Sequence, residues 1–266
     1  MATLLSLTTA RYLAPASFLY DFAAQQYGIN STPSMKDIHD RNLSFFSPQP
    51  YFIAGFFFPQ QFVQLAWLYK LWKLNPEKPE EKKQLQEMVR YVPFYALGNV
   101  CIGTWMFFWN AEKLQMANAF VVVNTTAQLF YVFTKLAPMN TRSTPSVLTH
   151  IVAKTFAGIG VLDILHNTSV GWFKDQLPST AVKVGTALGF AGLAAGSDWI
   201  LGGCLVYCLV GLSVGQASYD ASWSKLLGVY AVGTAAIVGV RNWVRPPYVK
   251  EEYEPLAEED DGEDRV

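Results

Sequence analysis

Long runs of apolar residues dominate this chain, and only a few short polar segments interrupt them. Three of the runs contain no charged residue at all, over residues 91–111, 114–134 and 199–219. A helix needs roughly 20 mostly apolar residues to cross the hydrocarbon layer of a membrane, because no water there can satisfy loose backbone groups. Each of the three runs therefore predicts one membrane-spanning helix.

Five further apolar stretches are weaker but complete the same pattern. They cover residues 10–27, 51–69, 147–170, 180–195 and 226–240, the last being extended by residues 221–225. Residues 10–27 are the weakest candidate, because Arg11 and Asp21 interrupt them. The pattern predicts an all-α fold, a polytopic integral membrane helical bundle with seven transmembrane helices, or eight if residues 10–27 also cross.

The composition agrees with a membrane location. Hydrophobic residues make up 51% of the 266 residues and charged residues 15%, whereas charge accounts for about a quarter of an ordinary soluble domain. Nine of the 21 acidic residues stand in the last sixteen positions, so residues 1–250 hold 12 acids against 19 bases. A basic, apolar body argues against a soluble enzyme domain and against a nucleic-acid partner. Residues 245–266 are expected to form a short disordered acidic tail.

A cluster of basic residues between two predicted spans sets the orientation. Residues 75–90 are expected to form a loop, and the bases in it and next to it are Lys70, Lys73, Lys78, Lys82, Lys83 and Arg90. Since loops rich in lysine and arginine stay in the cytoplasm, this loop and the C-terminal tail should be cytoplasmic. The N-terminus is cytoplasmic as well only if residues 10–27 span. The membrane itself, an endomembrane or the plasma membrane, stays open.

The chain divides by composition into two transmembrane halves. Residues 1–137 are rich in aromatic side chains, whereas residues 146–244 are rich in glycine and alanine. Three glycine pairs in the second half have a spacing of four, namely Gly185/Gly189, Gly192/Gly196 and Gly211/Gly215. Small residues at this spacing let helix backbones approach closely, so we expect tight helix packing there. The aromatic half should either enclose something bulky or supply the aromatic belts of a membrane protein.

One predicted span carries ionisable residues on a single face. Asp163, His166 and Asn167 are spaced i, i+3 and i+4. Ionisable residues inside a membrane are costly and mark functional sites by default. Lys183, near the start of the next predicted helix, could neutralise Asp163 in a structural ion pair. The alternative is a proton- or cation-coupled site, with Asp163, His166 and Lys183 as its candidate residues.

The same span carries a second polar pair toward its other end. His150 and Lys154 are spaced i, i+4. An interfacial position is the simplest interpretation, and Lys154 could there meet anionic lipid.

A proline and three amides occur together in the predicted span 51–69. Pro59 is followed by Gln60, Gln61 and Gln64. A proline inside a span frees a backbone carbonyl, and amides at the same level are typical of a kinked, hydrated or ligand-facing segment.

Sequence patterns give little support to catalysis. Residues 211–215 have the Gly-x-Ser-x-Gly spelling of a nucleophile elbow, but that motif requires a strand-to-helix turn and these residues lie in an apolar span. The three histidines lack metal-ligand spacing, and the sequence contains no phosphate-binding glycine loop. We therefore expect no enzymatic activity, no metal and no cofactor.

Two groups of aromatic residues in the first half form a known pattern. They are Trp67-Leu68-Tyr69 after Pro48, Pro50 and Pro59, and Trp105-Met106-Phe107-Phe108-Trp109 after Asn99. In this pattern, residues 10–170 resemble the translocator protein family, also called tryptophan-rich sensory proteins. The resemblance implies an aromatic pocket for a porphyrin- or sterol-like hydrophobic ligand, lined by Trp67, Tyr69, Asn99 and Trp105.

Three functions stay open at this point. The first is binding or transport of a hydrophobic small molecule in an aromatic intramembrane pocket, where Gln60, Gln64 and Asn99 would orient a polar group. The second is a proton-coupled secondary transporter that uses Asp163 and His166. The third is a membrane scaffold, embedded in lipid, whose acidic tail recruits a cytosolic partner.

Overall fold

The computed structural model describes residues 5–244, and the regular elements of this part of the chain are all α-helices. They are α1 (Leu7–Asn30), α2 (Met35–Arg41), α3 (Pro50–Lys73), α4 (Pro79–Asn110), α5 (Leu114–Thr134), α6 (Thr144–Trp172), α7 (Thr180–Gly196), α8 (Trp199–Gln216) and α9 (Ala221–Val244). The all-α fold class is confirmed. The predicted acidic tail, residues 245–266, lies outside the described residues.

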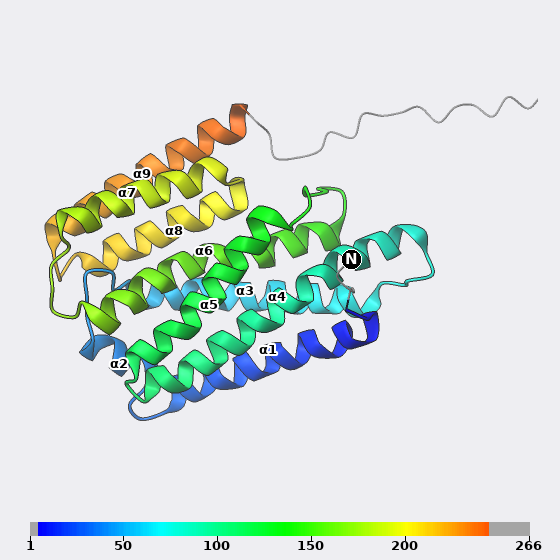
Figure 1. The fold of residues 1–266 in the computed structure, drawn as a ribbon, viewed down its shortest axis with the longest axis horizontal. Helices are drawn as coiled ribbons and strands as arrows, with labels where there is room; N and C mark the ends of the chain where they lie inside the picture. The colour runs from blue at the N-terminus through cyan, green and yellow to red at the C-terminus, as the bar shows by residue number, and fades with distance from the viewer. Residues whose placement is uncertain (1–4, 245–266) are drawn as a thin grey trace, which may run out of the picture.

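The long helices lie lengthwise beside one another, and α2 is a short helix at one end (Figure 1). α6 is the central helix, because it packs against α3, α4, α5 and α8. It is therefore buried along most of its length. α1 packs against α4 on one side of the bundle, whereas α7 and α9 pack against each other and α8 on the opposite side.

Five helices are long and apolar enough to cross a membrane, judged by length and composition: α4, α5, α6, α8 and α9. α7 is apolar but has only 17 residues. α1 and α3 each have 24 residues, but polar and charged side chains lower their hydropathy. These helices support a multi-pass membrane protein, with fewer spans by this measure than the seven or eight predicted.

The predicted loop at residues 75–90 is mostly helical, so this prediction is wrong. α4 begins at Pro79 and continues into the predicted span without a break. Proline suits the first helical position, where an N–H would have no partner. Glu80 and Glu81 lie in the first turn, where negative charge favours the helix dipole. The high charge of this segment keeps it out of lipid but does not prevent it from being helical.

The glycine pairs of the second half do not all serve tight packing. A Cβ added to Gly185, Gly189 or Gly192 of α7 would meet no atom within 4 Å. At Gly215 of α8 it would lie 2.4 Å from the backbone carbonyl carbon of Pro48. The prediction of close packing therefore holds for α8 and is wrong for Gly185, Gly189 and Gly192 of α7, whereas a Cβ on Gly196 would lie 3.1 Å from the Phe133 ring.

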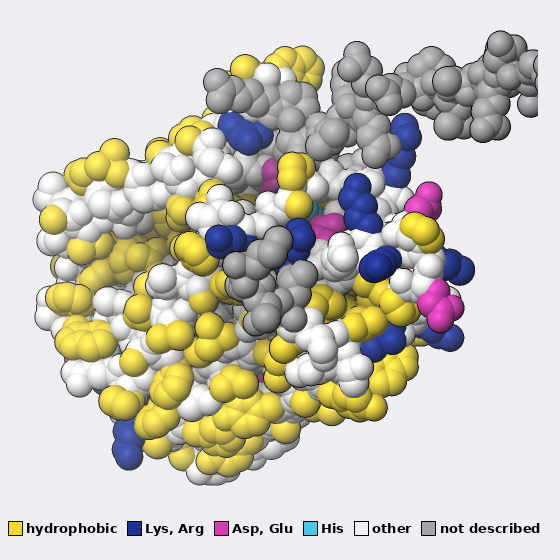
Figure 2. All heavy atoms as spheres, turned by 45° about the vertical axis from the view of Figure 1, so that its right-hand side comes forward, with side chains coloured by type: hydrophobic (Ala, Val, Ile, Leu, Met, Phe, Trp, Pro, Cys, Tyr) yellow, Lys and Arg dark blue, Asp and Glu magenta, His cyan; other side chains and the backbone are white. Residues whose placement is uncertain are grey.

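Basic side chains gather at the end of the bundle where α3 ends and α4 begins. Figure 2 shows Lys and Arg concentrated toward that end, whereas hydrophobic side chains cover much of the rest of the visible face. We call this the basic end, defined by Lys70, Lys73, Lys78, Lys82, Lys83 and Arg90. The opposite end, which carries α2, is called the α2 end.

Candidate ligand-binding cavity

A cavity of about 310 Å³ lies inside the α2 end of the bundle. Its wall is built by α1, α2, α3, α4 and α6, and it combines aromatic side chains with ionisable and amide side chains. The aromatic ones are Phe18, Phe22, Tyr51, Phe57, Trp105 and Trp109, and the polar ones include Asp21, Gln25, Gln26, His39, Gln61, Gln64, Asp163, His166 and Asn167. A mostly apolar wall with a few converging polar groups is typical of small-molecule sites.

α6 contributes its polar face to this cavity. Asp163, His166 and Asn167 all line it, as their shared helical face predicts. Trp105 of α4 donates a hydrogen bond of 2.7 Å from Nε1 to Asn167 Oδ1. Asn167 Nδ2 in turn donates to the backbone oxygen of Asp163 at 2.9 Å. The α6 wall is thus held in place by α4.

The carboxylate of Asp163 has no charged partner within residues 5–244. Every ion pair between described residues joins residues other than Asp163. No hydrogen bond between described residues involves the Asp163 side chain, since Asn167 binds its backbone oxygen. An ionised carboxylate in an apolar setting strongly favours a partner. Because Asp163 lines a cavity, that partner can be a ligand.

The expected ion pair between Asp163 and Lys183 is absent from the described residues, so this prediction is wrong. Lys183 belongs to α7, whose main packing partner is α9. The hydroxyl of Tyr230 on α9 donates to the backbone oxygen of Lys183 at 3.1 Å. The Lys183 charge acts instead on Asp220, whose pKa is lowered chiefly by a hydrogen bond from Ser222 and also by Lys183.

A second carboxylate faces the same cavity from α1. Asp21 lines it, and Gln25 Nε2 donates a hydrogen bond of 3.1 Å to Asp21 Oδ1. Close packing of α1 against α4 fixes this position, since a Cβ on Gly103 would lie 3.2 Å from Cα of Asp21. The cavity therefore holds two acidic side chains, which come from different helices.

Two histidines meet at the cavity, one from α2 and one from α6. The ring centroids of His39 and His166 are 5.2 Å apart, and the Trp109 ring lies 5.6 Å from His166. Burial lowers the pKa of His39 below its ordinary value of 6.5, while Asp40 raises it and Lys36 lowers it further. His39 is therefore neutral near pH 7. His166 is 6% exposed, and its Nδ1 has no hydrogen-bond partner in the described part of the chain.

Only part of the predicted ligand-binding set reaches the cavity. Gln64 and Trp105 line it. Gln60, Trp67 and Asn99 are buried among the helices, and Tyr69 is 58% exposed on α3. Gln64 and Trp105 belong to the hypothesis of a hydrophobic ligand, whereas Asp163 and His166 belong to that of a proton-coupled transporter. The structure places all four side chains around one cavity.

Trp67 is a packing residue rather than part of the cavity wall. It is fully buried, and its ring centroid lies 4.8 Å from that of Tyr95 and 5.7 Å from that of Tyr91. Its Nε1 donates a hydrogen bond of 3.0 Å to Thr149 Oγ1, which joins α3 to α6.

The buried glutamines connect this aromatic cluster with the cavity. The hydroxyl of Tyr95 donates to Gln64 Oε1 at 2.7 Å, and Gln64 Nε2 donates to Gln60 Oε1. Asn99 has a separate partner on α1, because its Nδ2 donates to Ser17 Oγ at 3.3 Å. α3 is a continuous helix through Pro59.

Sequence reasoning missed Asp21 and His39. Asp21 belongs to the weakest predicted span, and His39 lies between predicted spans. The available signal was the presence of an ionisable residue inside an apolar helix, which marks Asp21 in the same way as Asp163. His39 carries no comparable signal, because only the fold of α2 over the bundle brings it to the cavity.

Comparison with known proteins adds no identification. No family model, no curated protein and no solved structure matches this chain. The resemblance to the translocator protein family therefore stays a prediction. Within residues 5–244, no group of three or more His, Cys, Asp or Glu side chains could hold a metal ion.

Proposed function

We propose that α1 and α3 to α9 all cross a membrane, with the basic end in the cytoplasm. Their side-by-side arrangement in one bundle supports this (Figure 1), as does the concentration of lysine and arginine at one end. α1 and α3 would cross because packing against α4 and α6 covers part of their polar surface. The N-terminus and the end of α9 would then both be cytoplasmic, in an endomembrane or the plasma membrane.

Labelling of single introduced cysteines tests this topology. The three native cysteines are buried, so Lys83→Cys and Ser222→Cys report on opposite ends of the bundle. In sealed right-side-out vesicles, a membrane-impermeant maleimide should label Ser222→Cys and spare Lys83→Cys. Labelling of both variants, or of Lys83→Cys alone, would contradict the proposed arrangement.

We further propose that the protein binds, and carries across the membrane, a small and largely apolar molecule with a cationic group. The observation that supports this most is the Asp163 carboxylate, which faces the cavity without a charged partner in the described region. Asp21 adds a second negative charge from another helix, α1. Trp105 and Trp109 offer aromatic faces that attract cations, and their ring centroids are 5.3 Å apart.

The cavity volume restricts the size of this ligand. Small-molecule pockets cover about 300–1,000 Å³, and this cavity of about 310 Å³ lies at the lower limit. A compact aromatic or aliphatic cation fits that space better than a porphyrin or a sterol. The proposed ligand therefore keeps the hydrophobic character expected from the sequence but is smaller and positively charged.

A matched pair of probes tests the proposal. Benzyltrimethylammonium and neopentylbenzene have the same shape, but only the first carries a charge. In nanodiscs, tryptophan fluorescence should report tighter binding of the cation. Asp163→Asn should weaken cation binding at least about thirtyfold, because truncating a buried charge partner costs about 2–5 kcal/mol.

The control variant is Asp175→Asn, which removes an exposed acid at the same end of the bundle. Its cation affinity should equal that of the unmodified protein. Equal affinity of the unmodified protein for the two probes would contradict a cation site at Asp163. An equal loss of cation affinity in Asp163→Asn and Asp175→Asn would contradict it as well.

Proton-coupled transport is a second candidate that the same geometry favours. Asp163 and His166 line one cavity, and the two His rings lie 5.2 Å apart. In proteoliposomes, a pH gradient should then accelerate uptake of benzyltrimethylammonium, and Asp163→Asn should abolish the acceleration. If the pH gradient does not change the rate of uptake by the unmodified protein, proton coupling is refuted, and binding without proton coupling is the function that the cavity supports.

A further inference from the structure

The ligand-binding cavity carries more negative charge than one cationic group can neutralise. Its Asp and Lys residues are Asp21 on α1, Lys36 on α2 and Asp163 on α6. Lys36 forms an ion pair with Asp40, which does not line the cavity, so its charge is already balanced. Within residues 5–244, neither Asp21 nor Asp163 takes part in an ion pair. The cavity therefore holds two unbalanced negative charges when both of these carboxyl groups are ionised.

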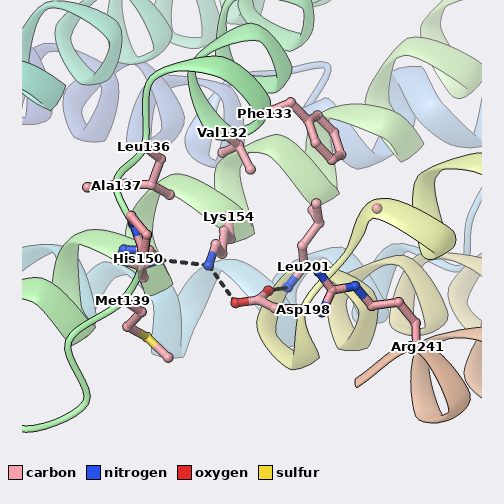
Figure 3. Close-up of a pocket in the computed structure, with 12 residues that line it drawn as sticks. Val132, Phe133, Leu136, Ala137, Met139, His150, Lys154, Asp198, Leu201 and Arg241 are labelled. Atoms are coloured by element: carbon pink, nitrogen blue, oxygen red, sulfur yellow. Dashed lines mark hydrogen bonds and ion pairs between the residues drawn. The ribbon is translucent and has the colours of Figure 1, made fainter. Parts of the chain in front are cut away.

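A second pocket, at the basic end of the bundle, shows how this protein balances a buried carboxylate internally. Asp198 Oδ2 lies 2.5 Å from the Lys154 ammonium, and Asp198 Oδ1 accepts from the backbone N–H of Leu201 (Figure 3). By contrast, Asp21 has a single hydrogen bond, from an amide, and the Asp163 side chain has none among the described residues. An ionised carboxylate in an apolar wall is costly without a counter-charge, so each of the two cavity acids favours a cation of its own.

The two carboxylates lie at about the same depth in the bundle. Helix α4 packs against both α1 and α6, so it relates the two positions. A Cβ on Gly103 would lie 3.2 Å from Cα of Asp21, and Trp105, two positions further along α4, bonds to Asn167 on α6. Asp163 precedes Asn167 by four positions, and α4 and α6 run in the same direction. The depths therefore differ by less than about one helical turn, and a ligand that lies across the cavity from α1 to α6 meets one carboxylate at each end.

A buried histidine beside Asp163 favours a ligand with N–H groups. His166 lies three positions after Asp163 on α6, lines the cavity and is 6% exposed. Its Nδ1 has no hydrogen-bond partner in the described part of the chain. A buried polar atom without a partner favours a ligand that forms hydrogen bonds. A primary ammonium group has three N–H donors, whereas a quaternary ammonium group has none.

We propose that the ligand of this cavity is a compact diamine, with one primary ammonium group at Asp163 and the other at Asp21. This inference rests on the proposed cation site and specifies the class of its ligand. A monocation leaves one carboxylate without a counter-charge, whereas a diamine balances both. Trp105 and Trp109 provide an aromatic wall for the apolar body between the two ammonium groups. The volume of about 310 Å³ restricts that body to a small ring or a short chain.

Two probes of equal shape test the second charge. Para-xylylenediamine carries an ammonium group at each end, and para-ethylbenzylamine has a methyl group in place of one of them. Tryptophan fluorescence of the full-length protein follows binding in nanodiscs of phosphatidylcholine, whose surface has no net charge and does not accumulate the diamine. The unmodified protein should bind the diamine at least about thirtyfold more tightly, the effect expected of one buried charge pair.

Three variants assign this preference to its residue. Asp21→Asn should weaken binding of the diamine about thirtyfold and leave that of para-ethylbenzylamine unchanged. Asparagine has the shape of aspartate and can still accept the hydrogen bond from Gln25. Asp163→Asn should weaken binding of both probes, because each places an ammonium group there. Asp175→Asn, which removes an exposed acid outside the cavity, should change neither affinity.

The outcomes separate the diamine from the cation site on which it rests. Equal affinity of the unmodified protein for the two probes would overturn the diamine proposal, and so would an Asp21→Asn variant that keeps the full preference. If Asp163→Asn still weakened binding of both probes, the cation site would stand in either case. Binding of both probes that Asp163→Asn leaves unchanged would overturn the cation site and the diamine together.

Discussion

Replacement of Gly215 by alanine provides a strict test of the packing that forms the cavity rim. An added Cβ would lie 2.4 Å from the carbonyl carbon of Pro48, 2.5 Å from the nitrogen of Gln49 and 2.5 Å from the oxygen of Ser47. All three are backbone atoms, so no change of rotamer can relieve the clash. Within the described residues no glycine has a positive φ, so alanine adds no backbone strain and the effect is purely steric.

The cost can be worked out from the contacts that would have to move. Overpacking alone costs about 1–3 kcal/mol. A shift would also strain the hydrogen bond of 3.0 Å from Gln49 N to the oxygen of Gly211. Gln216 Nε2 donates to the oxygens of Ser44 and Ser47 at 2.9 Å each, and each such bond contributes about 1 kcal/mol. Overpacking together with the loss of both Gln216 hydrogen bonds therefore lowers the free energy of unfolding by about 3–5 kcal/mol.

Thermal unfolding in detergent measures this loss. At about 2–4 °C per kcal/mol, the melting temperature should fall by about 10 °C. Pro48 and Pro50 line the cavity, so affinity for benzyltrimethylammonium should fall as well. The matched control is Gly189→Ala, whose Cβ meets nothing within 4 Å and which should stabilise the helix by up to about 1 kcal/mol. Equal melting temperatures for the two variants would refute the close approach of α8 to the segment before α3.

Three other outcomes follow from the structure. Lys154→Met alone should destabilise the protein by about 3–5 kcal/mol, because it leaves the buried Asp198 charge without its partner; addition of Asp198→Asn should restore most of the melting temperature. Trp67→Phe should cost about 1–3 kcal/mol through the lost bond to Thr149, yet leave cation binding unchanged, since Trp67 does not line the cavity. The pKa of His39 is lowered by burial from 6.5, so its neutral form contributes stability above about pH 6.5 that is lost as the pH falls below that value. Melting temperatures measured between pH 5 and 8 should therefore decline on the acid side, and His39→Gln should flatten part of that decline.

The local features of this protein follow from its sequence alone. Residues 114–134 predict a helix, and α5 covers Leu114–Thr134. Asp198 stands directly before the uncharged run at residues 199–219, and its side chain accepts from the N–H of Leu201 at the start of α8. The prediction that Asp163, His166 and Asn167 share one helical face is also confirmed, since all three line one cavity. The direction of a side chain around a helix depends on the helical period of 3.6 residues.

The contacts between helices depend on which helices become neighbours, and that is decided only by tertiary packing. α7 packs mainly against α9, and Lys183 forms no ion pair with Asp163 within the described residues. Lys154 pairs instead with an acidic residue 44 positions away in sequence. Asp21 joins Asp163 in one cavity because α1 packs against α4 beside α6. Apolar helices of similar length can pack in many orders, and the choice among those orders depends on close fits such as the one at Gly215. Such fits involve residues distant in the chain, so periodicity and composition determine the helices, whereas their three-dimensional packing determines the site.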